Sequence, residues 1–209
     1  MNMKWLKTYT EIQFNQLENY IKTLEKSLKN ESKNFEEWIL GEEKQLSEFQ
    51  KEEFFDFYSE QHQELSELFP NQLRLSFFII CYSTFEQSIN AISKNIEKSH
   101  KIKVSDLHGR GVIRAKNYLE KVADFDFSKH KALWEKIKDY NKIRNFIVHN
   151  YYGIGKSEEI ENVSPLLKRY ETIKVDSSSE IQISETFCHE VIKDFKLFLD
   201  SLFNSTSSK

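Results

Sequence analysis

Residues 128–150 read SKHKALWEKIKDYNKIRNFIVHN, and this stretch decides the fold class. Its apolar side chains recur at helical spacing, at Leu133, Trp134, Ile137, Tyr140, Ile147 and Val148. Ser128 is a residue type that caps helix N-termini, and Gly153 and Gly155 are typical of a helix end. The stretch therefore predicts a long helix that buries one side.

The segments on either side extend the helical pattern. Pro70 precedes an apolar stripe with steps of four and three residues, which predicts a core helix over 73–96. Its members are Phe78, Tyr82, Phe85, Ile89, Ile92 and Ile96. Residues 98–111 hold charged residues and two glycines and predict a loop, followed by a short helix over 112–123.

Beyond residue 150 the pattern changes twice. A polar loop is expected up to Pro165, and apolar and polar residues then alternate over 172–175 and 180–184 around a serine-rich turn. This alternation predicts a small β-hairpin. Ser184 offers an N-cap for a last helix whose stripe is Phe187, Val191, Phe195, Phe198 and Leu202. Residues 204–209 are expected to form a disordered tail.

The N-terminal segment, residues 1–69, is expected to form an acidic helical arm. Between Trp5 and Phe69 there is no proline and only one glycine, so the pattern predicts one very long helix or two helices joined near Gly41. The predicted architecture is all-α: this arm and a helical bundle over 70–203, with the small β-hairpin before its last helix.

The composition limits the class of protein. Of the 209 residues 39% are hydrophobic and 30% charged, with only 5 Gly and 2 Pro, which suits amphipathic helices. No stretch approaches the roughly 20 apolar residues that span a bilayer, and residues 1–9 do not resemble a signal peptide, so we expect a cytoplasmic protein without membrane contact. Cys81 and Cys188 lie in apolar stripes and are expected as buried thiols. The histidines show no metal-ligand spacing, and we expect no metal and no cofactor.

Charge is unevenly distributed along the chain. Residues 31–67 hold 12 acidic residues and three lysines, a local charge of −9, which would repel nucleic acid. Residues 94–116 hold seven basic and two acidic residues, a local charge of +5. Lys101, Lys103, Arg110 and Arg114 are therefore the residues expected to bind RNA phosphates. The alternative is a solvated surface between helices.

Three polar residues interrupt the apolar run near the end of the helix over 128–150. They are Arg144, Asn145 and His149. At about 100° per residue, Asn145 and His149 lie about 40° apart around the helix axis, and Arg144 about 140° from His149. All three share a broad face near the helix C-terminus, and a long guanidinium can span the gap.

This pattern resembles the HEPN family, whose ribonuclease members carry an Arg, a short gap and a His, often with Asn directly after the Arg. The resemblance covers residues 71–203 and has no counterpart for the arm. It implies a homodimer in which two arginines and two histidines face one cleft. The implied activity is metal-independent RNA cleavage by 2′-OH attack, giving 2′,3′-cyclic phosphate ends, in a toxin or antiphage-defence role.

The resemblance gives each site residue a role. His149 would transfer protons, Arg144 would stabilise the phosphorane charge, and Asn145 would position one of them or the phosphate. Glu86 would hold Arg144 as an acidic partner, or is simply a solvated surface residue. In some HEPN toxins the Tyr of an Arg-x4-His-x-Tyr pattern is adenylylated by an antitoxin nucleotidyltransferase, and Tyr151 fits that position. The simpler interpretation is that Tyr151 packs the helix end.

A second function fits the same fold. In a noncatalytic HEPN-like dimer, Arg144 and His149 would only cap the helix and contact the partner subunit. Such a dimer would act as a scaffold or a ligand-binding module in a defence or toxin-antitoxin complex. An acidic arm that binds another protein would favour this alternative, whereas a basic segment bordering the Arg144 and His149 cleft would favour the ribonuclease.

Overall fold

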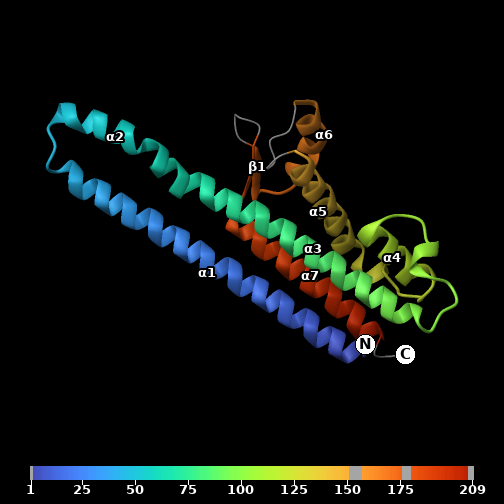
Figure 1. Ribbon diagram of the computed structural model, residues 1–209. Coiled ribbons are helices and arrows are strands. Elements are labelled where there is room, and N and C mark those ends of the chain that lie inside the picture. Colours follow the sequence, from blue (N-terminus) through green and yellow to red (C-terminus); the bar gives the residue numbers. More distant parts are fainter. Residues whose placement is uncertain (1, 151–156, 176–179, 207–209) are drawn as a thin grey trace.

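The computed structural model describes residues 2–150, 157–175 and 180–206, which form an all-α fold with a small antiparallel β-hairpin (Figure 1). The longer elements are α1 (Met3–Glu43), α2 (Glu48–Gln63), α3 (Phe69–Glu97), α4 (Gly111–Lys121), α5 (Lys131–His149), α6 (Ser157–Leu167), β1 (Ile173–Val175), β2 (Ile181–Ile183) and α7 (Glu185–Thr206). Short helical turns lie at Glu64–Leu68, Val104–Asp106 and Ser128–His130. The predicted fold class is confirmed, with the hairpin directly before the last helix.

Helices α1, α3 and α7 lie side by side, and α5 packs against α3 and α7 (Figure 1). The apolar stripes predicted for α3 and α7 meet in a layer of aromatic rings. Phe85 of α3 stacks on Phe195 of α7 with ring centroids 4.2 Å apart, and Phe14 of α1 meets Phe195 edge-on at 6.4 Å. Burying one such ring contributes about 2 kcal/mol to folding through the area removed from water. These rings hold three long helices together.

The N-terminal helix is only partly the exposed arm that the sequence predicts. Its buried residues, Leu6, Thr10, Phe14, Ile21 and Glu25, all lie in the first 25 positions and pack against the bundle. The first half of α1 therefore shares the core of the bundle. Beyond residue 25 neither α1 nor α2 buries a residue, and this part extends from the bundle after Lys29, which still pairs with Glu185 of α7 (Figure 1). The two helices are joined at residues 44–47, close to Gly41.

A buried ion pair marks the point where α1 leaves the bundle. The Glu25 side chain is 2% exposed, and both of its oxygens accept hydrogen bonds from Arg74 of α3. Arg74 Nε lies 2.6 Å from Oε1 and Nη2 lies 2.9 Å from Oε2. This hydrogen bond to Glu25 is the main reason why the pKa of Arg74 is raised above its ordinary value. A two-bond pair offsets the cost of burying both charges and fixes α1 against α3.

The hairpin pairs Ile173 with Ile183 and Val175 with Ile181. Asn71, in the first turn of α3, extends this pairing: its Nδ2 donates to the Ile181 carbonyl at 2.9 Å, and its Oδ1 accepts from the Ile183 N–H at 3.0 Å. The Ser184 hydroxyl accepts the Phe187 N–H at 3.2 Å, which confirms the predicted N-cap of α7.

Two local expectations were wrong. Helix α6 lies where a polar loop was expected. Its apolar residues Val163, Leu166 and Leu167 pack against the bundle. The sequence did not indicate this helix because its first half is charged and it contains Pro165. Ser128 does not cap α5, because it opens a separate short turn and α5 begins at Lys131. In addition, α7 continues to Thr206, into the expected tail. Among the described helices none is long and apolar enough to cross a membrane.

Candidate functional site

The predicted motif lies at the C-terminal end of α5. The apolar residues between and beside its members, Ile143, Phe146 and Ile147, are buried and fix this end of the helix against the core. Arg144 and Asn145 are half-buried, whereas His149, the last residue of α5, is exposed. The core packing of α5 therefore leaves the polar side chains at its edge, as the helical pattern predicts.

Arg144 is held by an aromatic ring and an amide, and among the described residues it pairs with no carboxylate. Its guanidinium carbon lies 6.0 Å from the centroid of the Tyr82 ring on α3, and Nη1 donates to Asn145 Oδ1 at 3.1 Å. Asn145 Nδ2 in turn faces Asn141 Oδ1 at 3.5 Å. Nε of Arg144 is buried and has no hydrogen-bond partner in the described part of the chain. The Tyr82 ring and the Asn145 amide thus fix the position of this cation.

Tyr82 is the site residue that the sequence did not reveal. It belongs to the apolar stripe of α3 and is buried as that stripe predicts, but its hydroxyl has no hydrogen-bond partner among the described residues. Burial raises the pKa of Tyr82 well above its ordinary value, the nearby Glu86 adds to the rise, and Arg144 opposes it. The hydroxyl therefore stays protonated at neutral pH and remains a hydrogen-bond donor beside the Arg144 cation.

Glu86 does not pair with Arg144. It lies one turn after Tyr82 on α3, half-buried, and its carboxylate faces Gly111 at the start of α4, where a Cβ would overlap it. Gly111 also has a φ of +52°, so a side chain is disfavoured there for two reasons. The positive end of the α4 dipole stabilises a carboxylate at this place. Among the described ion pairs none joins Glu86 to Arg144.

The contact between Glu86 and Gly111 lies in the last part of the basic segment. Lys101, Lys103 and Arg110 are exposed, and Arg110 is the N-cap of α4. Arg114 is half-buried, and its Nε donates to the Gly109 carbonyl at 2.8 Å, so this side chain supports the loop. The start of α4 touches Glu86, and Tyr82 on the next turn of α3 touches Arg144. The start of α4, with Arg110, therefore lies one turn of α3 from the residue that contacts Arg144, whereas Lys101 and Lys103 lie beyond the end of α3.

His149 is the part of the motif that reaches solvent. The structure assigns its ring no hydrogen bond or ion pair with any described residue, and none joins it to Arg144. Val148, next to it, is 43% exposed. Within the described part of the chain, one copy thus presents one exposed imidazole without a partner, next to an exposed valine. Tyr151, the expected adenylylation or supporting residue, lies outside the described residues.

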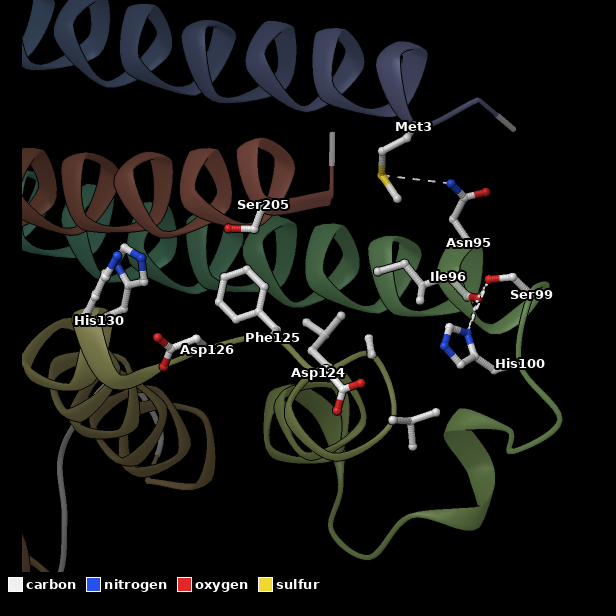
Figure 2. A pocket seen from close by; sticks show the side chains of 14 residues that line it. Met3, Asn95, Ile96, Ser99, His100, Asp124, Phe125, Asp126, His130 and Ser205 are labelled. Carbon is white, nitrogen blue, oxygen red and sulfur yellow. Dashed lines mark hydrogen bonds between the residues drawn. The ribbon is translucent and has the colours of Figure 1, made fainter. Parts of the chain in front are cut away.

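A separate cavity lies where α3, α4 and α7 end (Figure 2). It has a volume of about 550 Å³ and an apolar wall that includes Ile96 and Phe125. His100 and His130 stand at its opposite ends, and His100 Nδ1 lies 3.0 Å from the Ile96 carbonyl (Figure 2). No motif residue lines this cavity, so it is separate from the candidate site.

The described residues contain no group of three or more His, Cys, Asp or Glu side chains that could hold a metal ion. Cys81 and Cys188 are free and buried in the core, as predicted, and burial raises the pKa of both thiols, that of Cys188 to about 12. No family model, curated protein or solved structure matches the chain.

Proposed function

We propose that this protein is a metal-independent endoribonuclease that acts as a homodimer, in a toxin or antiphage-defence role. The observation that carries the proposal is Arg144. It is a half-buried cation, oriented by Tyr82 and Asn145, that forms no ion pair among the described residues and whose buried Nε has no partner there. A fixed cation of this kind suits a phosphate oxygen that gains charge during a reaction.

The chemistry uses residue types that this end of α5 supplies. The 2′-oxygen of the RNA forms a bond to phosphorus, its proton passes to one imidazole, and the bond from phosphorus to the 5′-oxygen breaks. A second imidazolium protonates the leaving 5′-oxygen, which yields a 2′,3′-cyclic phosphate and a 5′-hydroxyl. Arg144 stabilises the pentavalent phosphorane.

One chain offers one His149, so two copies are needed for both proton transfers. The exposed Val148 beside His149 supports contact with a second copy at this helix end. Arg110, the N-cap of α4, supplies positive charge for the RNA backbone, and Lys101 and Lys103 add positive charge just after the end of α3. In this proposal an antitoxin nucleotidyltransferase that modifies Tyr151 is the natural partner, as the HEPN resemblance implies.

The second candidate function is a noncatalytic dimeric scaffold in a defence or toxin-antitoxin complex. One observation favours it: α2 extends from the bundle with an acidic surface and exposed phenylalanines, as a helix for binding another protein would. Under this alternative Arg144 and His149 serve the subunit contact, and their replacement weakens the dimer.

The deciding experiment compares the wild type with Arg144→Ala, His149→Ala and the control Lys142→Ala, an exposed position on the same helix. Single-stranded RNA is incubated with each protein in excess EDTA, and the product ends are analysed. The wild type and Lys142→Ala should cleave equally and leave cyclic phosphates. The two site variants should lose about a hundredfold or more.

Stability separates the two candidate functions. If Arg144 and His149 are catalytic, both site variants should keep their dimer mass. Their free energies of unfolding should lie within about 1 kcal/mol of that of the wild type. If cleavage requires added Mg²⁺ or Mn²⁺, the metal-independent mechanism is wrong. If the dimer dissociates in step with lost activity, the scaffold is the better description.

A further inference from the structure

The outward side of α2 combines phenylalanines with carboxylates. Six exposed residues lie within an arc of about 140° on this helix, at 100° per residue: Phe49, Glu52, Glu53, Asp56, Phe57 and Glu60. We name this set the α2 outer face. Phe49 is 74% exposed and Phe57 is 77% exposed. None of its four carboxylates belongs to an ion pair among the described residues.

The α2 outer face is on a rigid support. Its opposite side packs on the distal half of α1 through a cluster of four aromatic rings, Phe35, Trp38, Phe54 and Tyr58, with centroids 4.9 to 6.2 Å apart. A capping box between Ser47 and Gln50 fixes the start of α2. The exposed phenylalanines are therefore not needed to hold the helical hairpin together, and their exposure calls for a partner.

The opposite end of the molecule carries the complementary chemistry (Figure 1). After α3 ends, Lys98, Lys101, Lys103 and Arg110 are all exposed, and Ile102 among them is 49% exposed. We name these five residues the basic pole. No ion pair in the described part of the chain includes its four cations. The basic pole, with one apolar side chain among cations, is thus complementary in charge to the α2 outer face, with phenylalanines among carboxylates.

We propose that the α2 outer face of one copy binds the basic pole of a second copy. Two chains that lie antiparallel about a two-fold axis form this contact twice, because each then places its α2 beside the other chain's basic pole. The assembly is closed and leaves neither surface free. The charge of −9 over residues 31–67 makes contact between two α2 outer faces unfavourable, which leaves the antiparallel arrangement. This inference concerns association only and does not rest on the proposed ribonuclease activity.

A charge-reversal experiment tests the contact. Sedimentation equilibrium at low ionic strength measures self-association of the wild type, of Glu53→Lys/Glu60→Lys and of Lys101→Glu/Lys103→Glu. Each variant should associate about tenfold or more weakly than the wild type, because like charges then face each other. An equimolar mixture of the two variants should regain the wild-type affinity, since both contacts in the mixed dimer again join opposite charges. The chain carrying all four changes should also dimerise.

Controls make the result specific. Lys174→Glu reverses an exposed charge on β1 and should leave the association unchanged. Phe57→Ser should weaken association, whereas Leu197→Ser, at another exposed apolar side chain, should not. Circular dichroism checks that each variant is folded. A wild type that stays monomeric at high micromolar concentration overturns the proposal.

Association that persists in both charge variants, or a mixture that fails to recover, also overturns it. In that event the α2 outer face binds a different protein and the dimer uses another surface. Association through another surface would leave the RNA-cleavage experiment on Arg144 and His149 unaffected, whereas a strictly monomeric wild type would also contradict the shared His149 site. The two failures are therefore distinguished by whether the wild type still associates.

Discussion

The backbone conformation and the charge of Asp124 both destabilise the folded protein. It follows α4 with a φ of +51°, a left-handed conformation that is unfavourable for a residue with a Cβ. Its backbone closes a chain reversal in which the Phe125 N–H donates to the Leu119 carbonyl at 2.9 Å. Its carboxylate also lies near the negative end of the α4 dipole, which disfavours an anion. Both effects lower the stability of the native state.

Replacing Asp124 with glycine should therefore stabilise the protein. The relief of backbone strain and of charge repulsion exceeds the larger entropy of glycine in the unfolded chain, and we expect a gain of about 0.5 to 1 kcal/mol in the free energy of unfolding. Urea denaturation measures it. Asp124→Asn should gain a smaller part, because it removes the charge and keeps the strained φ. A loss of stability in Asp124→Gly would show that the carboxylate has a stabilising role.

The sequence identifies some of the site residues and hides others for physical reasons. Arg144, Asn145 and His149 stand out because polar residues interrupt an apolar helical run. Tyr82 does not, because its ring satisfies the apolar stripe while its unpaired hydroxyl depends on how α3 and α5 cross. Glu86 is ambiguous in the sequence, and only the packing of α4 shows that it faces Gly111 and not Arg144.

At the scale of elements, α1 is held to α7 by surface ion pairs as well as by its core residues. Lys22 and Lys196 hydrogen-bond to Glu18 and lower its pKa, and Lys29 does the same for Glu185 at the start of α7. Lys196 Nζ lies 3.3 Å from Glu18 Oε2. Two of these contacts, Lys196 with Glu18 and Lys29 with Glu185, join α1 to α7.

These lowered pKa values predict an acid-sensitive attachment of α1. A carboxylate whose pKa is lower in the folded than in the unfolded state adds stability above its unfolded pKa, and this is lost as the pH falls through the folded value. The free energy of unfolding should thus decrease as the pH falls from about 5 to 3. Urea denaturation at several pH values measures the slope. In Lys29→Met/Lys196→Met the slope should be shallower, and an unchanged slope would assign the effect to other groups.

The sequence predicts well those helices and strands whose apolar residues follow one spacing along the whole element. Helices α3 and α7 and the hairpin belong to this group, because their apolar periodicity or alternation is uninterrupted. Helix α1 does not, because one helical period continues from the buried half into the exposed half without a proline or glycine at residue 25. Only the partner of Glu25, Arg74 on another helix, marks the change.

At the scale of the whole molecule, charge is separated between two ends, and the same cations enter both proposals. Lys101, Lys103 and Arg110 belong to the basic pole and are also the residues proposed to bind RNA. In an antiparallel dimer the α2 outer face of the second copy and an RNA strand would compete for them. The α2 outer face and an RNA strand are both negatively charged, and both carry planar rings, the phenylalanines of the one and the bases of the other. Both therefore suit the basic pole.

The composite site makes a prediction about mixed dimers. If each cleft needs one His149 to accept a proton and another to donate one, a dimer with one wild-type and one His149→Ala subunit lacks one of the two groups. Such a dimer should lose nearly all cleavage and not half of it. Differently tagged subunits, refolded together and purified through both tags, give the mixed dimer, and its mass should be twice 25.0 kDa.

The controls decide what the loss means. A mixed dimer of wild-type and Lys142→Ala subunits should retain full activity, which shows that tagging and refolding leave the site intact. Both mixed dimers should melt at the temperature of the wild type, because His149 is exposed and contributes little to folding. Half of the wild-type rate in the His149 mixed dimer would mean that each subunit works alone. In that case one imidazole performs both proton transfers, and the second copy serves the structure and not the chemistry.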